Sequence, residues 1–584
     1  MVKPQLQLSL AEQSVRTDIL ALLEKFSGRQ IDEAALTLDS PPDSKLGDYS
    51  VPCFLIAKEF KKNPNQVATE IAQTFEPTEW LEKVQAVGPY LNFFVNKVNF
   101  TAAVLNEIAK AKDKYGSSKL GKGRKVMVEY FSPNTNKPLT VGHVRNICLG
   151  AAVANLFRFS GYKVITSTLY NDRGIAIAKA MLGYQKWGKH KTPKSAKMKP
   201  DHFVGSFYVK FSQAEKEDEQ LTKEALRMLQ AWEADDKKAR DLWEKLMTWV
   251  LAGFKETIKK FGIDRFDEEY HESEYYDKGK QVVEDGLKKG VFVKDQDGLV
   301  YAPLEKFKLP DKIVLRPNET SLYITQDLYL AYLKDKHDVD VSIYIVGSEQ
   351  DLYFQQLFKI LEMLGFKNAS RYHHLSYGMI RLPDGKIKSR EGLAKGTGAD
   401  DLLEELETLA KQEITKRSPE LKVKEVDARA GQIALAALKF YILSVDPKTT
   451  MIFDPKQSIA FTGKTGPYLQ YVYARINSIF EKAGSKSTGK VDLKTLAEQV
   501  EFDLVKLLAK FPLVVSRSAA QYDPSELAAY LFDLAKSFSI FYEQVPVLQV
   551  EGKLQKARLL LIKDVKTVMA TGLELLGIKT LEKM

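Results

Sequence analysis

The chain has 584 residues, of which 44% are hydrophobic and 28% are charged, a composition that is typical of a folded globular protein and excludes a disordered chain. Three or four domains are expected, because a domain usually holds about 100–200 residues. The 86 lysines and arginines exceed the 76 acidic residues by 10, a surplus that fits a polyanionic partner without requiring one.

The two cysteines, Cys53 and Cys148, stand far apart and form no CxxC pair. Their spacing excludes a disulfide framework and a cysteine zinc site, and it suits a reducing compartment. No signal-peptide pattern opens the chain, and no apolar run approaches the ~18 residues that cross a bilayer. We expect a cytoplasmic protein without zinc and without a membrane partner.

The first unit is predicted to span residues 1 to about 116. Helical periodicity covers three stretches, 15–26, 51–60 and 64–75. Residues 84–95 alternate as strand, with a break at Gly88-Pro89. The segment 115–125 (YGSSKLGKGRK) is rich in Gly, Ser and Lys, and this composition predicts a linker.

A βαβ pattern follows the linker. It consists of a strand, a polar loop, a helix and a second strand, at 125–131, 132–138, 142–159 and 164–169. Parallel strands joined by a helix predict a Rossmann-like sheet that binds ligands at the carboxyl ends of its strands. Residues 183–261 are charge-dense and helical, so we interpret them as an insertion into that domain.

Six lysines occur in residues 186–199 with no acidic residue between them: Lys186, Lys189, Lys191, Lys194, Lys197 and Lys199. Taken alone, this run favours a solvated basic loop. Its position beside a nucleotide-binding fold raises the alternative that it contacts RNA phosphates.

Strand-like runs return at 343–346 and 375–382, and helices dominate after about residue 427. Apolar periodicity predicts five of them, at 432–443, 468–483, 504–515, 525–542 and 554–576. The C-terminal unit is therefore predicted to be all-helical.

Two segments carry candidate chemistry. In SPNTNKPLTVGH, Gly142 lets a ligand approach the backbone and the helix start offers free N–H groups to a phosphate, while Lys137 and His143 add donors. The second segment, DGKIKSREG at 384–392, follows a strand and is too polar to pack. Each one alone is more typical of a helix cap or a basic turn.

Together the two segments resemble the HIGH and KMSKS signatures of class I aminoacyl-tRNA synthetases. Longer stretches resemble the arginyl-tRNA synthetase family in order and spacing: EYFSPNTNKPLTVGHVRN, LYNDRGIAIAKAM, SLYITQDL, DLYFQQ and TGPYLQYVYARI. GDYSVP and VGPYLNFFV resemble that family's N-terminal tRNA-contacting domain, and the helical end, down to LLGI, resembles its anticodon-binding domain.

The resemblance implies a multidomain α/β protein. Its expected parts are an N-terminal α+β domain (1–116), a Rossmann-like catalytic domain (117–427) with a helical insertion (about 183–261), and an all-helical anticodon-binding domain (428–584). The implied protein is a monomeric arginine-tRNA ligase with L-arginine, ATP and tRNA(Arg) as partners. Mg²⁺ would arrive with ATP, and no cofactor would be permanently bound.

The resemblance also implies site residues, and no metal ligands are among them. The implied catalytic residues are Lys137, His143, Lys386 and Lys388. The implied ATP-binding residues are Thr140, Gly142, His143, Lys386 and Lys388. The implied arginine-binding residues are Glu129, Ser132, Asn134, His143, Tyr323, Asp327 and Gln350. Without the resemblance, Asp327 would be read as a surface helix residue and Tyr323 as core packing.

The sequence departs from the family pattern at two places. Thr140 replaces the first histidine of HIGH, and the KMSKS equivalent reads KIKSREG, with Lys388 at its third position and Arg390 beyond it. Which of Lys137, Lys386, Lys388 and Arg390 contacts which phosphate stays open.

Two alternatives remain open at this point. One is a class I synthetase for lysine or glutamine, although the acids Glu129 and Asp327 favour a cationic side chain over glutamine, and SPNTNKP and TGPYLQY favour arginine over lysine. The other is a non-catalytic RNA-binding paralogue, against which the retained His143 and Lys386 argue.

Overall fold

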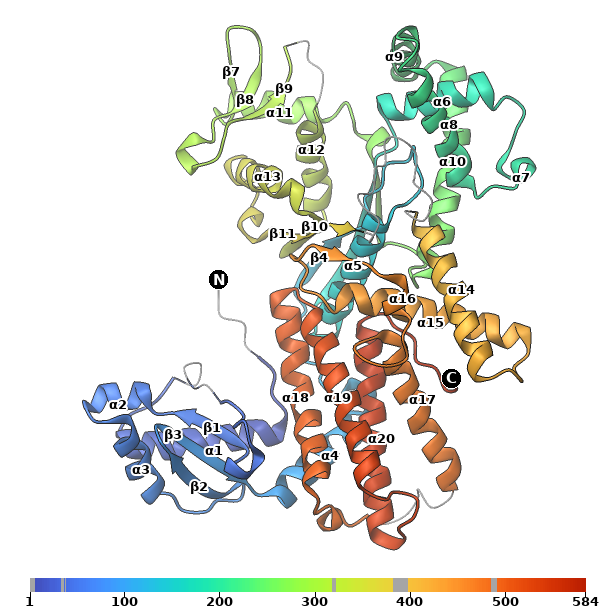
Figure 1. Cartoon of the computed structure of the whole chain (residues 1–584). Helices are drawn as coiled ribbons and strands as arrows, with labels where there is room; N and C mark the ends of the chain where they lie inside the picture. Colours follow the sequence, from blue (N-terminus) through green and yellow to red (C-terminus); the bar gives the residue numbers. More distant parts are fainter. Residues whose placement is uncertain (1–5, 33–35, 37, 318–321, 382–397, 485–490) are drawn as a thin grey trace.

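The structure is a computed structural model of the whole chain (Figure 1), and it describes residues 6–32, 36, 38–317, 322–381, 398–484 and 491–584. At its centre lies a parallel five-stranded sheet in the order β11-β10-β4-β5-β6. The strands are β4 (Lys125–Glu129), β5 (Lys163–Tyr170), β6 (Glu268–His271), β10 (Val341–Gly347) and β11 (His373–Tyr377). The predicted Rossmann-like sheet is confirmed, with α5 (Val141–Phe159) as the crossover from β4 to β5.

The N-terminal unit is an α+β domain, as predicted. Its antiparallel sheet has the order β1-β3-β2, formed by β1 (Tyr49–Pro52), β2 (Leu81–Val87) and β3 (Tyr90–Val95), beside α1 (Leu10–Ser27), α2 (Phe54–Phe60) and α3 (Pro64–Gln73). The helix expected from residue 51 begins only at Phe54, because Val51 pairs with Leu91 of β3. α4 (Lys97–Ala111), which the sequence did not predict, packs against the C-terminal helices α18 and α20.

The connection at 115–125 is packed, so the linker prediction was wrong. Tyr115 is buried and donates its hydroxyl to the Leu508 carbonyl at 3.0 Å. A Cβ on Gly121 would lie 2.5 Å from the Gly161 backbone. The glycines therefore allow close approach of two chain segments and do not provide the flexibility that their composition suggested.

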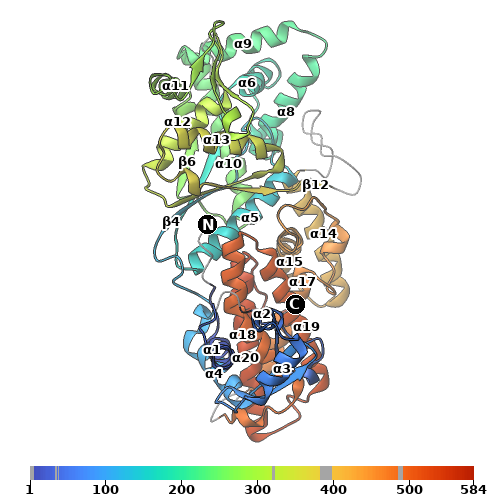
Figure 2. The ribbon, with the colours of Figure 1, turned by 90° about the vertical axis from the view of Figure 1, so that its left-hand side faces the viewer.

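Between β5 and β6 stands a purely helical region, which begins at Ile175. It comprises α6 (Ile175–Trp187), α7 (Pro193–Ala196), α8 (Pro200–Ala214), α9 (Gln220–Glu233) and α10 (Lys237–Lys260). The stretch 175–182, apolar except for Lys179, starts α6, which packs on α8. In both views this region and the C-terminal helices occupy opposite ends of the molecule (Figures 1 and 2).

A small antiparallel sheet after β6 was not predicted. β7 (Val293–Lys294), β8 (Val300–Ala302) and β9 (Lys312–Leu315) have two to four residues each, too few for alternation to be recognised. They follow α11 (Gly279–Lys288) and precede α12 (Tyr323–Asp335) and α13 (Asp351–Met363).

The predicted strand at 375–382 is two strands in the structure. β11 ends at Tyr377, and β12 (Ile380–Arg381) pairs with β13 (Met451–Ile452); residue 382 lies outside the described residues. The turn is fixed by Arg145 of α5, whose buried guanidinium donates to the carbonyls of Gly378, Pro447 and Thr449.

The C-terminal unit is helical apart from the two-residue strand β13, and the five helices predicted there are confirmed. They are α15 (Val423–Leu443), α17 (Gly466–Ala483), α18 (Gln499–Gln521), α19 (Ser525–Gln544) and α20 (Gly552–Leu575), and α14 (Ala399–Arg417) precedes them. In Figure 1 the N-terminal unit lies beside this bundle, where α1 and α4 contact α18. None of the helices in the described ranges is long and apolar enough to span a membrane.

Candidate active site

A cavity of about 860 Å³ opens where the carboxyl ends of β4, β5 and β10 meet α12 and α13. Ligands of parallel α/β sheets bind at this edge. Six of the predicted arginine-binding residues line the cavity: Glu129, Ser132, Asn134, Tyr323, Asp327 and Gln350. The sheet topology brings them together from chain positions more than 200 residues apart.

The turn that leaves β4 is held in an unusual conformation. Phe131 has φ +61°, the left-handed region that bulky residues rarely adopt. Its N–H donates to the Asn146 side chain, and its carbonyl accepts from the Thr168 hydroxyl. Such strain persists only where surrounding contacts enforce it, and it gathers at functional sites. Here the left-handed conformation changes the direction of the chain after Glu129, so that the following residues Ser132 and Asn134 line the cavity.

Two strand-end loops are joined beside this turn. The Thr135 N–H donates to the Asn171 carbonyl and the Asn171 N–H donates to the Pro133 carbonyl, both at 3.2 Å. The loops after β4 and β5 therefore form one rigid rim, on which Asn134 is exposed toward the cavity.

Glu129, the last residue of β4, forms a buried ion pair that the sequence did not predict. Lys334 Nζ lies 2.5 Å from Glu129 Oε2, and it also stands 4.1 Å from the centre of the Tyr344 ring. The two charges are close, although their alignment is not that of a hydrogen bond. Lys334 lies seven residues after Asp327 in α12, so both project from one helix face toward the cavity.

Asp327 has a different environment. It accepts a hydrogen bond from the Tyr353 hydroxyl, and no lysine or arginine in the described part of the chain forms an ion pair with it. Burial raises the pKa of Asp327 to about 6, and the neighbouring Glu129 adds to the shift. Asp327 is thus not the surface residue that its helix suggested, and Tyr323, 74% exposed, is not core packing.

Glu272, which the sequence analysis missed, is a further acid of this region. It follows β6 and is 6% exposed. Burial raises its pKa to about 7; Arg173 opposes the shift, and the carboxylates of Asp172 and Asp327 reinforce it. Glu272 stands in the acidic run EEYHESE, where no spacing distinguishes one acid from another. The LYNDRG stretch, by contrast, already contained Asn171, which lines the cavity.

His143 lies in the first turn of α5 and is not among the residues that line the cavity. Its Nδ1 accepts from the Thr140 N–H at 3.0 Å and lies 2.9 Å from the Thr140 hydroxyl. Burial, assisted by the charge of Lys137, lowers the pKa of His143 to about 4. The ring is therefore neutral at pH 7 and carries its proton on Nε2, because Nδ1 is an acceptor.

The region around Thr140 also contacts the start of α14. Ala399 N–H donates to the Leu139 carbonyl at 2.9 Å, and Thr140 pairs with Gly398 in an antiparallel bridge. A Cβ on Gly142 would meet only the Thr140 hydroxyl, at 3.5 Å. Lys386, Lys388 and Arg390 lie outside the described residues.

Three family models together match most of the chain. Residues 104–455 match the model described as tRNA synthetases class I (R), catalytic domain; residues 13–95 match the arginyl tRNA synthetase N terminal domain, and residues 469–584 match the DALR anticodon binding domain. A protein of Treponema denticola named arginine–tRNA ligase is 42% identical over 94% of this chain and 95% of its own length.

Two further comparisons agree. The arginine–tRNA ligase of Parabacteroides distasonis is 38% identical over 98% of this chain and 100% of its own length. The solved structure of the Thermus thermophilus arginyl-tRNA synthetase superposes with a TM-score of 0.82 at 27% identity, and the match covers 98% of this chain and 100% of that one.

Proposed function

Because the chain belongs to the arginyl-tRNA synthetase family, we propose a role for each part of its cavity in charging tRNA with arginine. The reaction has two steps. The arginine carboxylate attacks the α-phosphate of ATP and pyrophosphate leaves; a ribose hydroxyl of the terminal adenosine of tRNA then takes the arginyl group and AMP leaves. No covalent enzyme intermediate is required, so the protein acts by positioning and by stabilising charge.

The guanidinium subsite is assigned to Asp327, with Tyr323 on the same helix and Glu272 nearby. The observation that carries this assignment is the pairing state of the acids. Glu129 is ion-paired with Lys334, whereas Asp327 forms no ion pair among the described residues and is influenced by the same lysine only from a greater distance. A guanidinium is a planar fork of donors that suits a carboxylate. Its arrival would remove the unfavourable burial of an uncompensated acid.

The other end of arginine is assigned to the sheet edge. Ser132, Asn134 and Gln350 offer hydroxyl and amide groups near the carboxyl ends of β4 and β10. These groups suit the α-amino and carboxylate groups of an amino acid, and Glu129 adds a negative charge on the same strand. Arginine would then lie across the cavity with its carboxylate toward α5.

The phosphates of ATP are assigned to the start of α5. A neutral His143 with its proton on Nε2 is a hydrogen-bond donor at a helix N-terminus, and Thr140, Gly142 and Lys137 lie beside it. Lys386, with Lys388, is proposed to hold the departing pyrophosphate. ATP would enter as its Mg²⁺ complex, with the ion carried by the phosphates.

The remaining assignments extend to the whole chain. We divide it into a tRNA-contacting unit at 1–116, a catalytic unit at 117–427 and an anticodon-binding unit at 428–584. The protein would act in the cytoplasm, as a monomer, on tRNA(Arg). The exposed lysines Lys189, Lys191, Lys194 and Lys197 are the members of the 186–199 run that are candidates for contacts with RNA phosphates.

Citrulline tests the acidic subsite, because it replaces the guanidinium by a neutral group of the same shape. With tRNA(Arg) and ATP present, kcat/KM for arginine should exceed that for citrulline by about 10³-fold or more, since the wrong ligand leaves buried polar groups unpaired. Lysine and glutamine serve as comparison substrates. If citrulline is attached to tRNA(Arg) as efficiently as arginine, no acid of the cavity recognises the guanidinium.

A further inference from the structure

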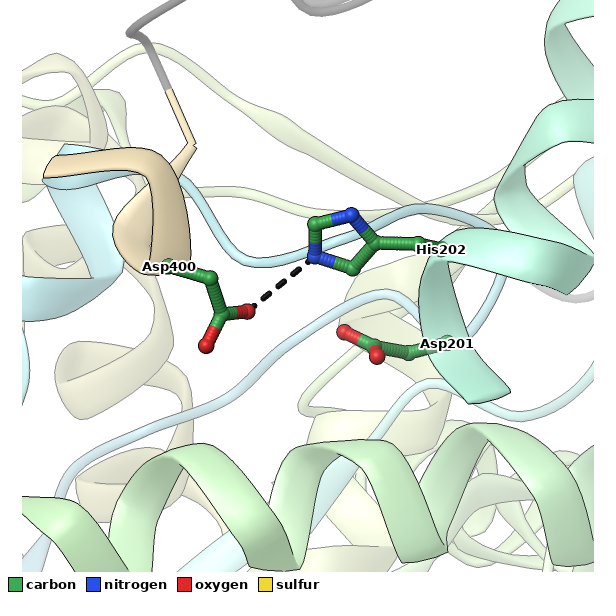
Figure 3. A group of neighbouring side chains, drawn as sticks. All are labelled: Asp201, His202 and Asp400. Atoms are coloured by element: carbon green, nitrogen blue, oxygen red, sulfur yellow. Dashed lines mark hydrogen bonds and ion pairs between the residues drawn. The ribbon is translucent and has the colours of Figure 1, made fainter. Parts of the chain in front are cut away.

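A second group of charged side chains lies outside the cavity, where three helices meet. Asp201 and His202 belong to the first turn of α8, Asp400 to the first turn of α14, and Thr257 to the last turn of α10. Figure 3 shows Asp201 and His202 facing Asp400 from a separate helix. Asp201 is fully buried and Asp400 is 5% exposed, so their charges need partners.

Partners are present for every carboxylate oxygen of this group except Asp201 Oδ2, which has no hydrogen bond among the described residues. His202 Nε2 lies 3.1 Å from Asp400 Oδ2, and the Thr257 hydroxyl donates to Asp400 Oδ1 at 3.1 Å. Lys199 Nζ stands 2.8 Å from Asp201 Oδ1 and 3.1 Å from Asp400 Oδ2. The ligand atoms of Asp201, His202 and Asp400 are close enough to surround a metal ion, but the Lys199 ammonium already supplies the cation. The group therefore ties elements together and is not a metal centre.

The helices α8 and α14, joined by this group, lie on either side of the HIGH-like segment around residues 138–140. On one side, Ala399, the residue before Asp400, donates its N–H to the Leu139 carbonyl, and Gly398 is bridged to Thr140. On the other side, α8 presses against the same segment, because a Cβ on Gly205 would lie 2.5 Å from Pro138 Cδ. Residues 138–140 are thus held between α8 and the start of α14, and Asp400 joins those two helices.

Thr140 in turn fixes the orientation of the His143 ring, because the Thr140 N–H donates a hydrogen bond to His143 Nδ1. We infer that Asp400 and its partner His202 are positioning residues for adenylate formation: by joining α8 to α14 across residues 138–140 they fix Thr140, and thereby the direction in which His143 presents its Nε2 proton. This inference rests on the proposed role of His143 at the phosphates. Small displacements of a positioned group reduce the rate of the chemical step more than they weaken substrate binding.

A double-mutant cycle tests the connection, with single-turnover adenylate formation measured on the full chain in the presence of tRNA(Arg). Asp400→Asn should lower the rate about tenfold or more, while the KM for arginine changes less than about twofold. In a His143→Ala background the same substitution should lower the rate less than about twofold, because the ring that Asp400 positions is absent. The matched control is Asp427→Asn, which removes an exposed carboxylate paired with Lys411 of α14 and should alter neither quantity.

Equal losses from Asp400→Asn in both backgrounds, or no loss in either, would overturn the inference. A wild-type rate in His143→Ala alone would instead overturn the proposed role of His143. If Asp400→Asn does not fold, the cycle is run with His202→Gln, which keeps a donor near Nε2 without the charge, and with His202→Ala, which removes the donor. The alanine variant should be slower than the glutamine variant, and both losses should disappear in the His143→Ala background; losses that persist there overturn the inference.

Discussion

Asp327 is half-buried in the second turn of α12 and Asp400 is buried in the first turn of α14, yet their surroundings shift their pKa values in opposite directions. Burial raises the pKa of Asp327 to about 6 and the charge of Glu129 adds to the rise, while the hydrogen bond from Tyr353 and the charge of Lys334 offset only part of it. Burial acts on Asp400 too, but the hydrogen bond from His202 and the charge of Lys199 outweigh it and hold its pKa well below the usual range. A carboxylate without a cation is prepared for a cationic ligand, whereas one surrounded by cations holds the protein together.

The largest expected effect is on arginine binding. Asp327→Asn should raise the KM for arginine about a hundredfold, since removing one member of a buried charge pair commonly costs a few kcal/mol. The KM for ATP should change less than twofold. Steady-state aminoacylation measures both, and Asp351→Asn, an exposed acid at the start of α13, is the charge-matched control. An arginine KM that stays within threefold would remove Asp327 from the subsite.

A pH profile separates the two aspartates without any substitution at Asp400. The kcat/KM for arginine reports ionisation in the free enzyme, so it should fall about tenfold between pH 7 and pH 5 as Asp327, with its pKa of about 6, becomes protonated. Asp400 stays ionised over this range. Glu272 titrates nearby, at about 7, so the profile is repeated with Glu272→Gln. The fall below pH 6 should remain in that variant and vanish in Asp327→Asn.

Thermal stability should change with opposite signs at the two positions. Asp327 has a raised folded-state pKa, so its contribution is present below the unfolded value near 4 and is lost as pH rises through 6; at pH 7.5 its ionised form is destabilising. Asp400 has a lowered pKa and stabilises the fold at all pH values above its unfolded one. By differential scanning fluorimetry, Asp400→Asn should lower the Tm by about 2 °C or more, and Asp327→Asn should leave it equal or higher. A lowered Tm in both variants would contradict the comparison.

The same distinction between paired and unpaired charges applies, with a smaller effect, to the lysines of 186–199. Lys186 is paired with Glu224 and Lys199 with Asp201. Among the described residues, no ion pair is formed by the exposed Lys189, Lys191, Lys194 and Lys197. Replacing the four exposed lysines by Gln should flatten the plot of log tRNA affinity against log salt by about one unit or more, because each phosphate contact releases counterions. Lys186→Gln should leave the slope unchanged. An unchanged slope in the fourfold variant would identify the run as a solvated loop.

Much of the fold could be predicted because it depends on local patterns. The crossover helix at 141–159 and the C-terminal helices have sustained apolar periodicity, and the hairpin around Gly88-Pro89 has its turn residues in place. The three short strands of the sheet after β6 could not be predicted in this way, because strands of so few residues show no recognisable alternation of polar and apolar side chains. The connection at 115–125 was misjudged since its glycines serve a close approach that only the tertiary structure reveals.

The cavity residues were named from the resemblance, and spacing alone would not have selected them. Lys334 sits in the last turn of a helix, where lysine is normally solvated, and its burial against Glu129 depends on how α12 meets the sheet. Glu272 and Asp400 became distinguishable from other acids only through their neighbours. The assignments of Lys386 and Lys388 stay predictions, because the structure does not describe those residues.

The left-handed backbone at Phe131 has a consequence for how this sequence can change. The conformation favours glycine by about 1–3 kcal/mol, but the Phe131 ring is wholly buried among Tyr170, Phe254 and Phe266, and losing a buried aromatic costs about 3–5 kcal/mol. A glycine at this position would remove the backbone strain but leave a cavity in the core. Any other residue would keep the backbone strain and fill the space of the ring less well. No single substitution improves both, so replacing Phe131 is expected to stabilise the fold only if a second substitution refills the core.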